Sequence, residues 1–146
     1  MTNNQNQQVS FALIEITTEN LSITPENFDE NTPVQINIGL NFGINSEKQS
    51  LKTLFKASFH QNDQEFLIIE TGCAFALDQN SWKMLANDEI KKFILPRTLA
   101  AHFALLTAGT ARGILHAKTE NSPLNRFIIP ANNLDGLIEK DIVLNY

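Results

Sequence analysis

The segment VQINIGLNFGI, residues 34–44, alternates apolar side chains with polar or small ones without a break. Every even position from Val34 to Ile44 is apolar, and every odd position is Gln, Asn or Gly. A strict period of two is typical of a β-strand that buries one face and leaves the other face in water. The segment therefore predicts a strand of an antiparallel sheet with one open face.

Three further segments have strand character. Residues 9–23 form a long, less regular strand, residues 51–59 alternate again, and residues 65–77 are apolar on both faces. A strand of the last kind is covered on both sides or lies at an interface. The linkers at residues 45–50 and 60–64 are short polar turns, so the strands that they join must be antiparallel neighbours. We therefore predict an α+β fold in which a four-stranded antiparallel meander sheet is followed by helices.

Residues that mark the ends of helices follow the last predicted strand. A short helix or turn is expected at residues 81–93, and a long helix starts at Pro96. Proline loses nothing at the first position of a helix, because its missing N–H would have no partner there. The long helix should run to about Lys118, a length of roughly 35 Å at ~1.5 Å per residue.

The long helix has no polar side. Larger apolar residues fall on one side of a helical projection, and small ones fall nearly opposite. A helix that is apolar nearly all round is a buried helix, and one four-stranded sheet covers only one side of it. We therefore expect the other side to pack against a second subunit; the alternative is a monomer whose own sheet wraps further around the helix. The candidate interface comprises Leu99, Ala101, Phe103, Ala104, Leu106, Ala108, Ala111 and Ile114.

The chain beyond the helix is an apolar loop between prolines. Residues 119–123 form a turn, and RFIIP at residues 126–130 is a short extended run. Asn132 and Asn133 can cap a last short helix that reaches Leu137. An apolar run that cannot join the interior of a regular sheet is either core filler or a preorganised contact surface.

Size and composition indicate one folded domain. The chain has 146 residues, of which 42% are hydrophobic and 18% are charged. The opening MTNNQNQQ resembles neither a signal nor a transit peptide, so we expect residues 1–8 to be a disordered tail and residues 9–146 to be the domain. No segment is long and apolar enough for membrane insertion. The single cysteine, Cys73, lies in an apolar context that indicates a buried structural thiol in a reducing cytoplasm.

The charges and polar motifs argue against catalysis. The net charge is −5, and the acidic residues lie mostly before Ile90, with none between Ile90 and Thr119. The basic residues of that stretch are too dispersed for a nucleic-acid site. The three histidines, His60, His102 and His116, lack metal-ligand spacing, and neither a phosphate-binding loop nor a nucleophile motif is present. We therefore predict no metal, no cofactor and no enzymatic activity.

Three short motifs resemble those of the SecB-like export chaperones. They are LPR at residues 95–97 at the start of the long helix, Gly113 near its end, and PANNLDGL at residues 130–137. The predicted order of elements agrees with that family over residues 9–140. The resemblance implies a four-stranded antiparallel sheet, a long helix, a proline-bounded crossover loop and a short C-terminal helix.

The resemblance also implies a cytoplasmic, ATP-independent holdase. Such a protein is a homotetramer, a dimer of dimers with the long helices between the sheets, and it binds unfolded or precursor proteins for protein export in hydrophobic grooves. An acidic sheet face would recruit the translocase motor SecA. The matching groove residues of this chain are Phe42, Ile44, Phe127, Ile128, Ile129, Leu134, Leu137 and Ile138. For each of these residues the alternative is plain core packing.

Three functions are compatible with these patterns. The first is the holdase just described, which captures diverse unfolded clients. The alternative is a SecB-like interaction subunit that binds one dedicated protein partner, such as an antitoxin. A third function, that of an enzyme or small-ligand binder, would need a pocket with converging polar groups, which the sequence does not indicate.

Overall fold

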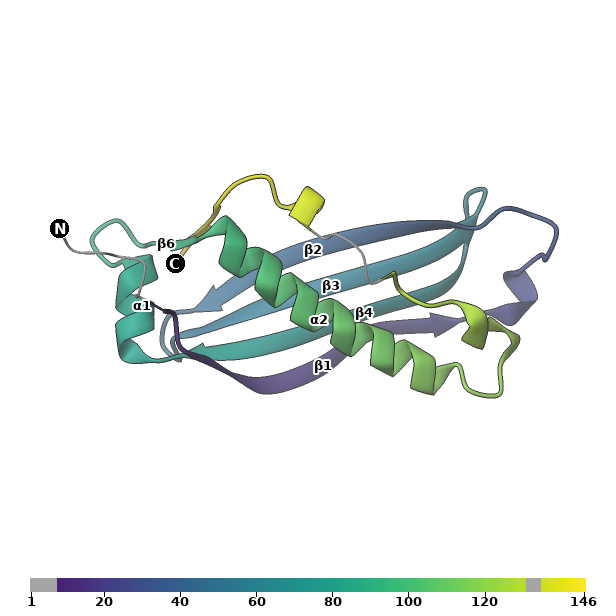
Figure 1. Cartoon of the computed structure of the whole chain (residues 1–146), viewed down its shortest axis with the longest axis horizontal. Helices are drawn as coiled ribbons and strands as arrows, with labels where there is room; N and C mark the ends of the chain where they lie inside the picture. Colours follow the sequence, from purple (N-terminus) through teal and green to yellow (C-terminus); the bar gives the residue numbers. More distant parts are fainter. Residues whose placement is uncertain (1–7, 131–134) are drawn as a thin grey trace.

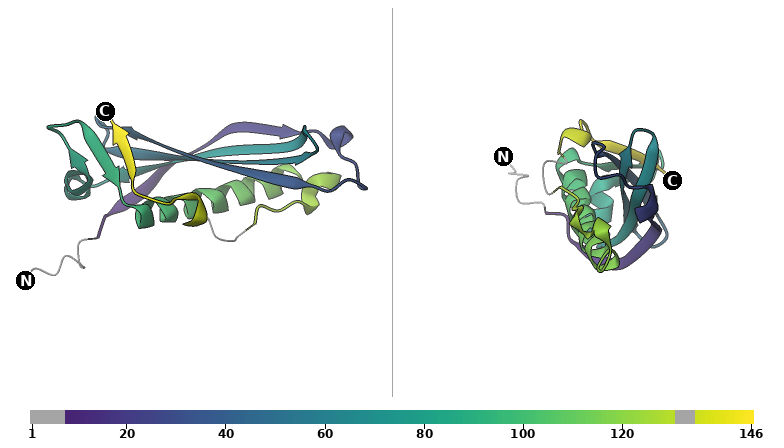
Figure 2. Two further views of the ribbon diagram at one scale, coloured as in Figure 1. Left: turned by 90° about the horizontal axis from the view of Figure 1, so that it is seen from above. Right: turned by 90° about the vertical axis from the view of Figure 1, so that its right-hand side faces the viewer.

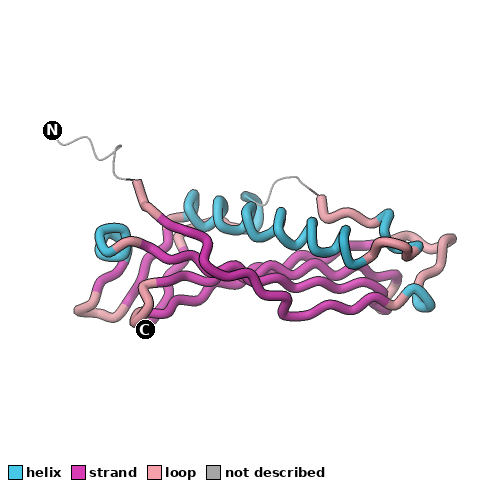
Figure 3. The backbone as a smooth tube through the Cα atoms, turned by 90° about the horizontal axis from the view of Figure 1, so that it is seen from below, coloured by secondary structure: helices cyan, strands magenta, loops and turns pink. Residues whose placement is uncertain are grey.

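The computed structural model describes residues 8–130 and 135–146. A long antiparallel sheet forms one layer of the molecule, and a single long helix lies diagonally across one of its faces as the second layer (Figures 1 and 3). The predicted α+β class, with four antiparallel strands and one long helix, is confirmed. The bounds of these elements are β1 Phe11–Ile23, β2 Gln35–Asn45, β3 Ser50–Gln61, β4 Gln64–Leu77 and α2 Arg97–Lys118.

The strand order of the large sheet is β1-β4-β3-β2. The predicted meander holds for β2, β3 and β4, which follow one another through tight turns. β1 instead joins the sheet on the far side of β4, with Phe11 opposite Leu77 and Ile23 opposite Leu67. The reason is the connection at residues 24–34, which contains the short 3-10 helix Pro25–Asn27 and is too long for a hairpin turn. β1 and β2 are therefore the two edges of the sheet.

The core lies between the sheet and α2. Alternate residues of β3 and β4 point towards the helix and are fully buried, as the period of two requires. Cys73 is one of them, which confirms the predicted buried thiol. The apolar core forms two clusters. Thr53 on β3, Thr71 on β4 and Thr107 on α2 belong to neither cluster, although all three are fully buried.

The small-residue side of α2 packs on the chain's own sheet, and this corrects half of the predicted subunit interface. The helix contacts β3 and β4, and alanines allow its backbone to approach the strands closely. Four of the predicted interface residues are fully buried in this fold and therefore cannot contact a second subunit. They are Phe103, Ala104, Ala108 and Ala111. Leu99, Ala101 and Ile114 are half-buried, and Leu106 is exposed.

A second, smaller sheet lies at one end of the molecule and was not predicted. It has the order β5-β6-β7, with β5 at Ala86–Asn87, β6 at Lys92–Leu95 and β7 at Ile142–Asn145. The expected helix or turn at residues 81–93 is instead helix α1, Gln79–Leu85, followed by the β5–β6 hairpin. The side chain of Asp78 caps α1 by accepting a hydrogen bond from the Ser81 N–H at 2.7 Å.

The C-terminal region runs back along α2 (Figure 2). It begins with a 3-10 helix at Pro123–Arg126 and contains a second 3-10 turn at Asp135–Leu137, in place of the predicted last helix. Asn132 and Asn133, the predicted cap of that helix, lie outside the described residues.

Candidate functional site

The predicted peptide-binding residues fall into three groups. Ile129 and Ile138 are fully buried, so the core-packing alternative is correct for them. Phe42, Ile44 and Phe127 are half-buried and pack against the two core clusters. Ile128 and Leu137 are exposed, with 62% of Ile128 accessible to solvent. The eighth candidate, Leu134, lies outside the described residues.

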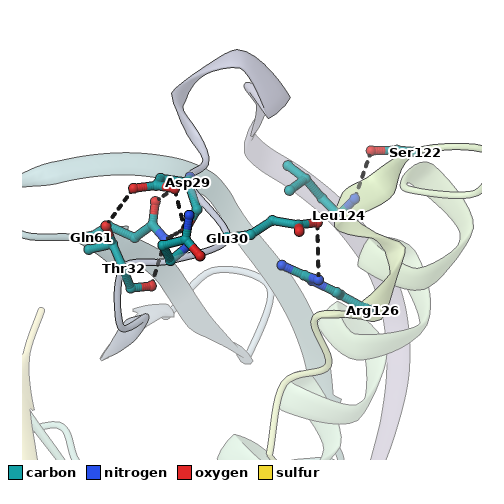
Figure 4. A network of polar contacts seen from close by, with 8 residues as sticks. Asp29, Glu30, Thr32, Gln61, Ser122, Leu124 and Arg126 are labelled. Carbon is teal, nitrogen blue, oxygen red and sulfur yellow. Dashed lines mark hydrogen bonds and ion pairs between the residues drawn. The ribbon is translucent and has the colours of Figure 1, made fainter.

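Local hydrogen bonds hold the start of the C-terminal segment against the end of α2. Ser122 caps the 3-10 helix by accepting a hydrogen bond from the Leu124 N–H at 3.1 Å, and Leu124 is fully buried (Figure 4). The Asn125 side chain donates to the main-chain oxygen of His116 at 3.0 Å. These contacts fix the direction in which residues 126–130 leave the helix.

Phe127 is anchored in an aromatic cluster at this end of the molecule. Its ring centroid lies 5.3 Å from that of Phe28, 5.6 Å from that of Phe59 and 5.2 Å from that of Phe66. The Arg126 guanidinium lies over the Phe28 ring, 4.5 Å from its centroid, an arrangement that favours a cation–π interaction. The cluster therefore links residues 126–130 to the β1–β2 connection through Phe28 and to the sheet through Phe59 and Phe66.

A polar network supports the same end of the sheet. The Arg126 guanidinium lies 3.8 Å from the Glu30 carboxylate, and both side chains are largely exposed (Figure 4). The Gln61 side chain accepts a hydrogen bond from the Asp29 N–H at 2.9 Å and donates to the Thr32 main-chain oxygen at 3.0 Å. The β1–β2 connection is thus bonded to the end of β3, next to the aromatic cluster.

Two arginines of α2 bind the C-terminal region through its main chain. Arg112 donates from Nε to the Ile129 oxygen at 2.8 Å and from Nη2 to the Pro130 oxygen at 3.2 Å. Arg97 donates from Nε to the Ile138 oxygen at 2.7 Å. Charged donors give the stronger class of hydrogen bond, so these contacts hold the main chain against α2, with the Ile129 side chain buried and that of Ile128 exposed.

A groove lies between α2 and the segment that Arg112 holds. Its volume is about 390 Å³. Phe127 and Ile128 contribute apolar surface, and α2 has no side chain at two of its lining positions, Gly109 and Gly113. The lining residues are Gly109, Arg112, Gly113, His116, Phe127 and Ile128.

Further apolar side chains are exposed on the face of the molecule that carries α2. Leu105, which is 52% accessible, and Leu106 lie on the side of the helix that faces away from the sheet. Leu13 and Ile16 of β1 pair with the buried residues Phe75 and Cys73 and share their face of the sheet, yet about half of each side chain is accessible. Exposed apolar side chains grouped on one face are typical of an interaction surface.

Leu105 was not identified from the sequence, although a signal was present. Successive helix residues lie about 100° apart, so on a helix that is apolar nearly all round some large side chains must face away from a single sheet. Leu13 and Ile16 were expected to belong to an ordinary strand. Their exposure results from the diagonal course of α2, which does not cover the whole of β1 (Figure 1).

The charges are distributed differently on the two faces of the sheet. α2 has no acidic residue, and in the described parts of the chain the only ion pairs are Lys52–Glu19 and Arg126–Glu30. The open face of the sheet carries charges of both signs. Lys56 of β3 and Glu70 of β4, for example, are neighbours in the strand register. The expected acidic sheet face is therefore not present as a uniform surface.

Residues 8–130 and 135–146 contain no group of three His, Cys, Asp or Glu side chains that could hold a metal ion. Over the same residues, the structure has no helix of the length and hydrophobicity needed to cross a membrane.

Comparison with known proteins gives a weak likeness to solved structures. No family model matches the sequence, and no curated protein matches it. Among solved structures, the chain is similar to a SecB-like chaperone of Mycobacterium tuberculosis in complex with a ChAD peptide from the HigA1 antitoxin. The match covers 86% of this chain and 90% of that chain, with 8% sequence identity and a TM-score of 0.41. A likeness of this size does not assign a function, which must follow from the surface of the chain itself.

Proposed function

We propose that this protein binds exposed apolar segments of unfolded or precursor polypeptides and keeps them from aggregating, without nucleotide hydrolysis. The observation that carries the proposal is the apolar surface of the helix-bearing face, where Leu105 and Ile128 are more than half exposed beside a preformed groove. The sequence offers no phosphate-binding loop that would couple binding to a nucleotide.

The energetics of this surface favour weak, broad binding. Fully burying a Leu or Ile side chain contributes about 1.5–3 kcal/mol. Association costs about 4–15 kcal/mol in lost freedom of motion, so several such side chains must be covered together. Because Phe127 and Arg112 already hold residues 126–130 in place, little further ordering of the protein is needed on binding.

The proposal includes self-association through the remaining part of the predicted interface. Leu106 is 40% exposed, and Leu99 and Ile114 are half-buried on the same side of α2, whereas the half-buried Ala101 lies nearly opposite them. We propose a dimer of dimers in which a second copy covers this side of the helix. The molar mass in solution tests this proposal, and a concentration-independent monomer would contradict it. Docking of SecA is not part of the proposal, because the open face of the sheet is not uniformly acidic.

Aggregation of chemically unfolded client proteins tests the proposed function. Several unrelated clients are diluted from denaturant, and light scattering is followed with and without stoichiometric protein. We expect suppression for all clients and weaker suppression by the double variant Leu105→Ser, Ile128→Ser. The matched control is Asn37→Ser, an exposed position on the opposite face of the sheet.

Each outcome of that assay decides between the functions. Unchanged aggregation of every client at stoichiometric protein would contradict the proposed function. Suppression of a single client only, with saturable binding to that protein, would instead support a subunit dedicated to one partner. Equal suppression by the control and by the double variant would place the binding surface elsewhere on the molecule.

A further inference from the structure

Two glycines in α2 have no explanation in the packing of the chain itself. Glycine inside a helix costs about 0.5–1 kcal/mol relative to alanine. A Cβ added at Gly113 would meet no atom within 4 Å, and one added at Gly109 would meet only Nη1 of Arg112, at 3.8 Å. Alanine would therefore fit at both positions. The two glycines therefore make α2 less stable than alanines would, and both of them line the groove.

The groove beside these glycines is preformed and partly apolar. Phe127 is fixed by the aromatic cluster, and the exposed Ile128 lines the same cavity of about 390 Å³. Volumes of roughly 300–1,000 Å³ are typical of ligand sites. Because the helix side lacks Cβ atoms at residues 109 and 113, the main chain of a bound segment can approach α2 closely.

Arg112 brings a positive charge to the lining of the groove. Arg112 uses Nε and Nη2 to hold the Ile129 and Pro130 oxygens, while Nη1 faces the Gly109 side of the groove. Among residues 8–130 and 136–146, no carboxylate lies within ion-pair distance of Arg112. A lysine or arginine of a bound segment would lie beside this guanidinium, whereas an Asp or Glu side chain would pair with it.

We propose that this groove takes an extended apolar segment that carries an Asp or Glu side chain next to Arg112, so that the protein prefers acidic to basic clients. This inference rests on the proposed function and names the class of client. Complementary charge at a partly exposed contact changes affinity modestly and is screened by salt. We expect an acidic segment to bind about fivefold more tightly than a neutral one, and a basic segment to bind more weakly than either.

Three fluorescent peptides that differ at one central position test the preference. They share one apolar sequence and carry Glu, Gln or Lys at that position, and fluorescence anisotropy gives the dissociation constant of each at two salt concentrations. The expected order of affinity is Glu, then Gln, then Lys, with the differences shrinking as salt is added. Equal affinities, or tighter binding of the Lys peptide, would overturn the inference while leaving polypeptide binding intact. Failure of all three peptides to bind would instead contradict the proposed function.

A matched pair of variants locates the preference in the groove. Gly113→Glu places a carboxylate where the space is open, and Gly113→Gln places a neutral side chain of the same size there. Both residues are better helix formers than glycine, so the fold is retained, which circular dichroism verifies. We expect Gly113→Gln to weaken all peptides and keep their order, and Gly113→Glu to reverse the order of the Glu and Lys peptides. An order unaffected by Gly113→Glu would place the charge recognition elsewhere and overturn the inference.

Discussion

Lys52 on β3 forms an ion pair with Glu19 on β1, with 2.6 Å between Nζ and Oε1, although β4 lies between the two strands. The lysine reaches across because Gly72 of β4 has no side chain: a Cβ there would lie 2.7 Å from Cε of Lys52 and 2.6 Å from Oγ1 of Thr17. The hydrogen bond from Lys52, together with its charge, lowers the pKa of Glu19 below its usual value. Gly72 therefore allows an edge strand to be tied to the middle of the sheet.

The first prediction concerns Gly72, where the Lys52 side chain crosses β4. Gly72→Ala should displace Lys52 and Thr17, separate the ion pair and lower the free energy of unfolding by about 1–2 kcal/mol, the usual effect of overpacking. Denaturant unfolding measures the loss, and hydrogen exchange should show faster opening of β1. The matched control is Gly43→Ala, where an added Cβ meets nothing within 4 Å. Equal stability of the two variants would contradict the explanation.

The second prediction concerns the buried threonines that belong to neither core cluster. The hydroxyls of Thr53 and Thr71 are buried and have no hydrogen-bond partner among the described residues, whereas that of Thr107 donates to the Phe103 oxygen at 2.8 Å. Removing an unsatisfied hydroxyl removes its desolvation penalty, so Thr53→Val or Thr71→Val should stabilise the fold by about 1 kcal/mol. Thr107→Val, which also loses a hydrogen bond, should gain nothing. Thermal unfolding of the three variants checks this order, and destabilisation by the first two would refute it.

The third prediction concerns Tyr146, the only tyrosine of the chain. Its hydroxyl donates to the Asp88 carboxylate in the turn between β5 and β6, and this hydrogen bond, with partial desolvation, raises the pKa of Tyr146 to about 12. The folded state thus holds the phenolic proton more tightly than the unfolded state, whose pKa is 10.0. The stability from this contact is complete below pH 10 and is lost as the pH rises towards 12.

Ultraviolet titration of the tyrosinate band measures the Tyr146 pKa directly, because no other tyrosine contributes. We expect a midpoint near the raised value in the wild type and a lower one in Asp88→Asn, which removes the charged acceptor. The stability of Tyr146→Phe should fall less between pH 10 and pH 12 than that of the wild type, because phenylalanine has no hydroxyl to ionise. A wild-type midpoint equal to that of an exposed tyrosine would show that the contact with Asp88 is absent in solution.

Regular patterns in the sequence predicted the large elements well. The period of two at residues 34–44 corresponds to β2 at Gln35–Asn45, and the predicted helix from Pro96 to Lys118 corresponds to α2 at Arg97–Lys118. Both segments are long, and each pattern repeats several times within one element. The order of the strands was only partly predictable, because no local signal shows that β1 pairs with β4 rather than with β2.

The small sheet and the buried side of α2 depend on distant contacts. β6 and β7 have only four residues each, so neither shows a usable period, and 46 residues lie between Leu95 and Ile142. The alanines of α2 were expected to meet a second subunit, since a helix that is apolar nearly all round does not show in its sequence which side faces the sheet. Burial also divides neighbours that look alike in sequence: Ile128 is exposed and Ile129 is buried, and no local pattern shows which of the two side chains faces the core.

Site-specific crosslinking from residue 128 tests the central claim most directly. Cys73 is fully buried, so Ile128→Cys offers one accessible thiol for an apolar photocrosslinker, and Asn37→Cys offers the same probe on the opposite face. We predict that an unfolded client crosslinks to the probe at residue 128, that the same client in its folded form does not, and that the probe at residue 37 captures little of either. Equal capture from both positions, or capture of the folded client alone, would contradict a polypeptide-binding surface beside α2.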